Sequence, residues 1–174
     1  MANHVVVNTD KIMSAKYGNS VSVVHSSDLD NGTVVALGAL SATDREVFTA
    51  AVSATPTTDL LVFIHTPEFQ GDLYLPGKTL KDFYNVANKP MRGYFLHEGD
   101  IITITDNGIT GATTVGQYVI PTAGATKLSA AADLSGNTRL AFKVIEKLDA
   151  TTAFSYTGSG YEKETASVLM VVKR

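Results

Sequence analysis

Short apolar segments rich in β-branched residues recur along this chain at intervals of about ten residues. The pairs Asn-Gly, Thr-Gly and Pro-Gly separate many of them, and such pairs are typical of tight turns between strands. β-Branched side chains fit the pleated, half-buried surface of a sheet. The pattern therefore predicts an all-β fold, a sandwich or a barrel-like structure, with one or two short helices.

In the predicted strands, apolar and polar residues alternate or nearly every residue is apolar. These strands are residues 21–24, 33–37, 46–51, 60–65, 93–97, 101–105, 114–120, 138–147 and 167–173. The clearest alternation is in residues 138–147, where we expect Leu140, Phe142 and Val144 to point inward. Residues 60–64 are wholly apolar, as in a strand that is covered on both faces.

One helix is predicted in the middle of the chain. Leu80, Phe83, Tyr84 and Ala87 are spaced i, i+3, i+4, i+7, so a helix over them would present one apolar face. Pro90 would end it. We interpret residues 68–92 as a helical insertion in a β-rich body that spans residues 21–174. Residues 11–17 are a candidate for a second helical turn.

The first 20 residues differ from the rest, because their larger apolar side chains are few and scattered. This pattern predicts an extended N-terminal arm over residues 1–20 that docks on another chain. The candidate partner-binding residues of the arm are Val5, Val6, Val7, Ile12, Met13 and Tyr17.

Composition excludes several classes of function. There is no cysteine, so a disulfide framework and a thiolate site are impossible. The net charge is −3 and there is no basic run, which argues against binding to nucleic acid. The apolar runs are far shorter than the roughly 20 residues of a membrane-spanning helix, and the N-terminus does not resemble a signal peptide. We therefore expect a protein made in a cytoplasm that interacts with neither nucleic acid nor membrane.

No motif predicts catalysis or a cofactor. Gly77-Lys78-Thr79 has the end of a phosphate-binding loop, but Leu73 occupies the place of its first glycine. Gly158-Ser159-Gly160 lacks the nucleophile-elbow pattern. We expect no enzyme activity and no cofactor. We interpret the first segment as a helix start after the Pro76-Gly77 turn and the second as a flexible loop.

Metal binding is also not predicted. The four histidines are far apart, and the His97–Asp100 turn offers too few ligands for zinc. Asp28-Leu29-Asp30-Asn31-Gly32 resembles the start of a calcium loop, but its twelfth position is Ala39 where a bidentate glutamate is needed.

The aromatic residues between Tyr156 and Tyr161, with Phe154 nearby, allow two interpretations. They could form a patch that binds a ligand, or they could be ordinary sheet residues.

Two stretches resemble the capsid decoration proteins of tailed phages, also called cement or head auxiliary proteins. The first runs from Asp28 to Gly38, where a turn with Asn-Gly leads into valines. The second combines Gly99–Ile104, Gly116–Pro121 and Gly124–Leu128, followed by a final pair such as Leu140–Glu146. The resemblance lies in the texture and order of the segments.

This resemblance implies a structural protein of the virion that binds the major capsid protein on the outer surface of the capsid and stabilises the shell. It also implies a homo-oligomer, often a trimer. The chain is longer than the smallest decoration proteins. Two alternatives remain: another virion or surface binding module, such as a tail, baseplate or carbohydrate-binding domain, and an enzyme whose residues converge from distant strands.

Overall fold

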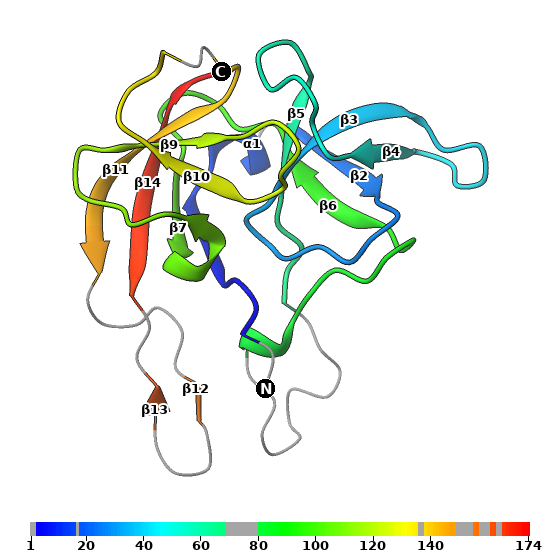
Figure 1. Cartoon of the computed structure of the whole chain (residues 1–174). Coiled ribbons are helices and arrows are strands. Elements are labelled where there is room, and N and C mark those ends of the chain that lie inside the picture. The colour runs from blue at the N-terminus through cyan, green and yellow to red at the C-terminus, as the bar shows by residue number, and fades with distance from the viewer. Residues whose placement is uncertain are drawn as a thin grey trace.

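β-Strands make up most of the regular structure of this chain, which confirms the all-β prediction (Figure 1). The computed structural model describes residues 3–16, 18–68, 80–135, 138–148, 155–156, 161–162 and 165–174. The N-terminal half contains β1 (Val7–Lys11), α1 (Met13–Lys16), β2 (Ser20–Val24), β3 (Val34–Leu40), β4 (Val47–Ala51), β5 (Leu61–Ile64), the 3-10 helix η1 (Leu80–Asp82) and β6 (Met91–Tyr94). The C-terminal half contains β7 (Ile101–Thr105), the 3-10 helix η2 (Asp106–Gly108), β8 (Ile109–Thr110), β9 (Tyr118–Pro121), β10 (Leu128–Ala131), β11 (Ala141–Leu148), β12 (Ser155–Tyr156), β13 (Tyr161–Glu162) and β14 (Ala166–Lys173).

Five strands close into a small barrel in the order β2-β4-β3-β5-β6. β2 and β4 run parallel, and the other neighbours are antiparallel. The interior is tight: a Cβ added at Gly93 would lie 2.3 Å from Val62 Cγ1. The smaller of two clusters of buried residues belongs to this barrel. It consists of Val23, Leu29, Val35, Val62, Ile64 and Met91.

The remaining long strands form a seven-stranded sheet in the order β1-β7-β14-β11-β9-β10-β8. All its pairs are antiparallel except the short contact between β10 and β8. β14 lies between β7 and β11. The separate hairpin β12–β13 pairs Tyr156 with Tyr161.

The larger of the two clusters of buried residues contains residues of both the barrel and the sheet. β5 is buried on both faces, as predicted, but Leu60 before it is 43% exposed. Leu61 and Phe63 belong to the large cluster that the sheet lines, whereas Val62 and Ile64 face the barrel interior. The rings of Phe63 and Phe142 lie 6.3 Å apart, centroid to centroid, and join the two parts.

The N-terminal segment corrects our expectation of an arm outside the body. Val5, Val6 and Val7 are each only 2% exposed. β1 pairs with β7, and Thr105 N donates to Val6 O at 3.1 Å. Because these valines fill the core of their own chain, residues 3–16 are part of the body and the predicted boundary at residue 20 does not hold.

The helical insertion predicted over residues 68–92 is also corrected in its described part. Only Leu80–Asp82 is helical, as a single 3-10 turn. Beyond it, Asn85 and Leu29 exchange two main-chain hydrogen bonds of 2.8 and 2.9 Å, which a helix through Asn85 would lose. The predicted second helical turn is present as α1.

Several strand predictions are confirmed within a few residues. Residues 101–105 form β7 with the predicted bounds, and Leu140, Phe142 and Val144 are buried. The predicted strands 93–97 and 114–120 are displaced, because β6 ends at Tyr94 and β9 begins only at Tyr118. The sequence patterns do not predict strands β1, β8, β10, β12 and β13.

Candidate functional site

The candidate calcium loop is used to hold the chain together. Its carboxylates separate: Asp28 Oδ1 accepts a hydrogen bond from Ala87 N at 2.7 Å, whereas Asp30 Oδ1 lies 2.6 Å from His4 Nδ1. The His4 ring stacks on Tyr84 with 5.0 Å between the centroids. The loop therefore joins the N-terminal segment to the segment after η1, and its oxygens do not converge on one point.

Asn31 occupies the centre of this junction and is fully buried. Its amide nitrogen donates to Thr66 O at 2.9 Å and to Glu68 Oε1 at 3.3 Å. Its amide oxygen accepts from Thr66 N and from Asn85 Nδ2, both at 3.0 Å. Such a satisfied network in a low-dielectric interior fixes the relative position of the segments.

His65 follows β5 near this junction and is 92% buried, at 8% exposed. Its Nδ1 has no hydrogen-bond partner among the residues that the structure describes, and its ring lies 6.2 Å from that of Tyr94. Burial lowers the pKa of His65, and the charge of Arg92 adds to the effect. Burial also raises the pKa of Glu68, although the hydrogen bond from Asn31 opposes it.

The arrangement most similar to catalytic chemistry is a Ser–Lys–Asp network beside η2. Lys147 Nζ donates to both carboxylate oxygens of Asp106 at 2.7 and 2.6 Å and to Ser167 Oγ at 3.0 Å. Ser167 Oγ in turn donates to Asp106 Oδ1 at 2.7 Å. Burial raises the pKa of Asp106, but the hydrogen bonds from Lys147, Thr165 and Ser167 outweigh it and the pKa is lowered.

This network does not have the properties of a Ser–Lys catalytic dyad. In such a dyad the lysine amine accepts the serine proton, whereas Lys147 Nζ donates hydrogen bonds to Asp106 and to Ser167. Ser167 is also fully buried, so a substrate has no access to its hydroxyl. Asp106, Lys147 and Ser167 therefore connect η2, β11 and β14 through polar contacts.

The histidines do not form a metal centre. Asn19 Nδ2 lies 2.6 Å from His97 Nε2, and Ser27 N donates to His25 Nδ1 at 3.0 Å. Among the described residues, no three histidine or acidic side chains come together as metal ligands.

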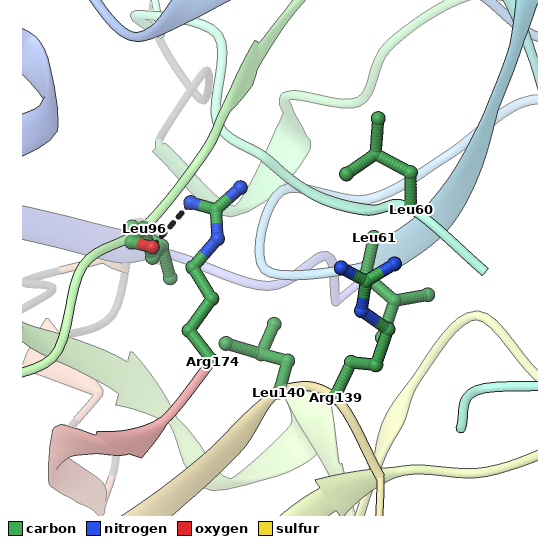
Figure 2. A pocket seen from close by; sticks show the side chains of 6 residues that line it. All are labelled: Leu60, Leu61, Leu96, Arg139, Leu140 and Arg174. Atoms are coloured by element: carbon green, nitrogen blue, oxygen red, sulfur yellow. Dashed lines mark hydrogen bonds between the residues drawn. The ribbon is translucent and has the colours of Figure 1, made fainter. Parts of the chain in front are cut away.

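Two arginines line a small recess where the barrel meets the sheet (Figure 2). Arg139 precedes β11 and Arg174 follows β14. The antiparallel pairing of these strands brings their side chains to the same end of the sheet. The apolar wall consists of Leu60, Leu61, Leu96 and Leu140.

Sequence reasoning missed this site, since the two arginines are far apart in the chain and neither belongs to a motif. The predicted partner-binding residues lie elsewhere. Val5, Val6, Val7 and Ile12 are buried in the body, so their side chains are not available to a partner. Met13 is 48% exposed, and Tyr17 lies outside the described residues.

Several other motifs fall wholly or partly outside the described residues. They are the Gly77–Thr79 segment, Phe154 and the Gly158–Gly160 segment. The main chain at Tyr156 and Tyr161 is described as the hairpin β12–β13.

The comparisons with known proteins do not identify a family. A scan against models of protein families gives no match, and a search of curated protein sequences gives none either. In the described part of the chain the α-helical segment has four residues, and no helix there meets the length and apolar character of a membrane span. The fold and its sites thus define an all-β protein whose described polar side chains mainly connect its own segments.

Proposed function

We propose that this chain is a structural auxiliary protein that binds the outer surface of a tailed-phage capsid and stabilises the shell. The structural role rests on one observation: polar side chains connect segments of the chain that are distant in sequence. The networks around Asn31 and Lys147 are satisfied within the chain and tie together segments that are distant in sequence. A body braced in this way suits a protein that acts by presenting a fixed surface.

The choice of partner rests on the resemblance of segments 28–38 and 99–128 to decoration proteins, and the all-β fold supports it. Such a protein needs contact area on a repeating lattice, since many copies on one shell gain avidity even when each contact is weak. Each contact contributes roughly 25 cal/mol per Å² of apolar area buried, before the costs of association. The partner would be the major capsid protein, and a homo-oligomer such as a trimer would multiply the contacts.

The experiment uses empty, expanded heads of tailed phages. The purified chain is mixed with the heads and centrifuged, and the pellet is examined by cryo-electron microscopy. We expect the chain to sediment with the heads, to occupy regular positions on their outer surface and to raise the temperature at which they disrupt. A chain that stays in the supernatant, or that sediments without regular positions, would contradict the proposal.

A second candidate is another surface binding module, for example a carbohydrate-binding domain. The main-chain pairing of Tyr156 with Tyr161 in the hairpin β12–β13 favours it, because it brings two residues of an amphipathic aromatic type to paired positions in sequence register. Binding of the chain to a glycan array, lost in Tyr156→Ala, together with failure to bind heads, would select this candidate over the first.

A further inference from the structure

The recess between Arg139 and Arg174 carries positive charge that acidic side chains of the described residues balance only in part. In Figure 2 the side chains of Arg139 and Arg174 extend in the same direction on either side of Leu140. The two guanidinium groups therefore face one opening from two different strand ends.

Main-chain oxygens hold both arginines but do not neutralise them. Arg139 Nη1 donates to Thr58 O at 3.1 Å, and Arg174 Nη1 donates to Leu96 O. The Arg174 guanidinium also lies over the Phe95 ring, 5.0 Å from its centroid. Each guanidinium has five N–H donors, so these contacts orient the groups and leave donors for a ligand.

The balance of charge around the recess is positive. Within the described residues, neither arginine has an acidic side chain at salt-bridge distance. Burial lowers the pKa of Arg174, and the charge of Arg139 lowers it further, whereas Asp100 raises it. Asp100 is fully buried and its two oxygens already accept hydrogen bonds from Met13 N and His97 N, both at 2.8 Å. One committed carboxylate thus offsets two guanidinium charges only in part.

The shape and lining of the recess restrict what can enter it. The space inside the recess is small, about 20 Å³, which is room for about one water molecule, and leucines form its apolar wall. Leu60 is 43% exposed and lies beside the arginines. Only the small end of a ligand group fits inside, and an apolar neighbour of that group would lie outside the recess, on Leu60. The net charge of −3 and the lack of a basic run disfavour a nucleic-acid backbone.

We propose that the recess binds the carboxylate of an acidic side chain presented by a protein partner. The carboxylate enters between Arg139 and Arg174, which hold it by charge-assisted hydrogen bonds. An apolar residue next to the acidic one packs on Leu60. The carboxylate site stands on the geometry of this chain alone. Its use as a contact with the capsid rests on the proposed function.

The first test measures binding to the full chain by nuclear magnetic resonance, through the Nε–Hε signals of the arginines. The probe is N-acetyl-Leu-Asp-amide, and its matched control is N-acetyl-Leu-Asn-amide. We expect saturable shifts of the Arg139 and Arg174 signals with the aspartate probe, with a dissociation constant of the order of millimolar. The asparagine probe should leave both signals unchanged.

Variants then distinguish specific recognition by the two arginines from nonspecific attraction between opposite charges. Arg139→Gln and Arg174→Gln should each weaken binding of the aspartate probe about tenfold, the loss expected for a hydrogen bond to a charged group. Arg139→Lys should also weaken it, since lysine keeps the charge but loses the planar fork. Arg45→Gln is the control, because the Arg45 side chain is 94% exposed and lies near Glu46. Its binding should equal that of the wild type.

Each outcome supports or overturns the inference. Equal shifts with both probes, or a loss in Arg45→Gln as large as in Arg139→Gln, would overturn it. Acetate and inorganic phosphate are titrated separately. If either binds as tightly as the aspartate probe, the recess is a site for free anions, and the proposal that a protein partner presents the carboxylate is wrong.

A final arm distinguishes this inference from the proposed function. If wild-type chain binds phage heads and the double variant Arg139→Gln/Arg174→Gln binds them equally well, the contact role of the recess is overturned and the function stands. If the wild type binds the aspartate probe but no heads, the function fails and the carboxylate site stands.

Discussion

Removal of the N-terminal strand should unfold this protein. Deleting residues 1–11 removes β1, whose partner is β7, together with Val5, Val6 and Val7. Burying one valine contributes roughly 1.5–3 kcal/mol, so three contribute roughly 5–9 kcal/mol. This is comparable with the whole stability of a typical domain, about 5–15 kcal/mol. We therefore expect the truncated chain to lose its cooperative unfolding transition or to show a strongly lowered midpoint.

The measurement is urea unfolding followed by far-ultraviolet circular dichroism, since the chain has no tryptophan. Two point variants make the test quantitative. Val7→Ala removes two buried methyl groups and should cost about 2 kcal/mol, including the cavity. Met13→Ala, at a side chain that is 48% exposed, should change stability by less than about 0.5 kcal/mol. A truncated chain with the midpoint of the full chain would refute the reasoning and restore the idea of a separate arm.

Two further predictions concern backbone conformation and pH. Gly32 has φ +82°, and an added Cβ would lie 2.5 Å from Ile104 Cδ1, so Gly32→Ala should destabilise by about 2–4 kcal/mol in the same unfolding assay. An unchanged midpoint would show that the turn relaxes easily. The folded-state pKa of His65 lies below its usual value, so the unfolded state binds more protons and the unfolding free energy should fall as pH drops below about 6.5. His65→Gln should flatten the dependence of that free energy on pH between about pH 7.5 and 5.5, and an unaltered slope would contradict the assignment.

Local sequence patterns predicted the parts of the fold in which burial follows a regular period. β11 alternates, and its inward residues Phe142 and Val144 are fully buried. β5 is apolar throughout because one face lines the barrel and the other faces the sheet. In both strands the pattern of the side chains directly reflects the surfaces that cover them.

The N-terminal strand gave no such signal. Val5 and Val6, which precede β1, and Val7 at its start are all buried, although alternate residues of an extended segment point to opposite faces. They are covered because segments from both halves of the chain close over them. The hydrogen bond between Val6 N and Thr105 Oγ1 spans 99 positions, so no local pattern could show it. Likewise, the pairing of Asn85 with Leu29 overrides the helical period of residues 80–87.

The recess illustrates why the candidate site could not be predicted. Arg139 and Arg174 are brought together by strand register, since Ala141 pairs with Lys173. Neither arginine has a neighbour in sequence that signals a ligand. A search for charged residues at the adjoining ends of paired strands could have found them, but only after the pairing was known.

The position of the recess connects the site to the stability of the whole protein. Leu60 and Leu61 come from the barrel side, whereas Leu140 and Arg174 come from the ends of two strands of the sheet. A bound partner would contact both parts at once, because its carboxylate would meet the two arginines of the sheet and its apolar residue would pack on Leu60. Because the ligand binds only the folded arrangement, it stabilises that arrangement by linkage, in proportion to its occupancy. Contact with a partner would thus reinforce the same junction that Phe63 and Phe142 hold from inside.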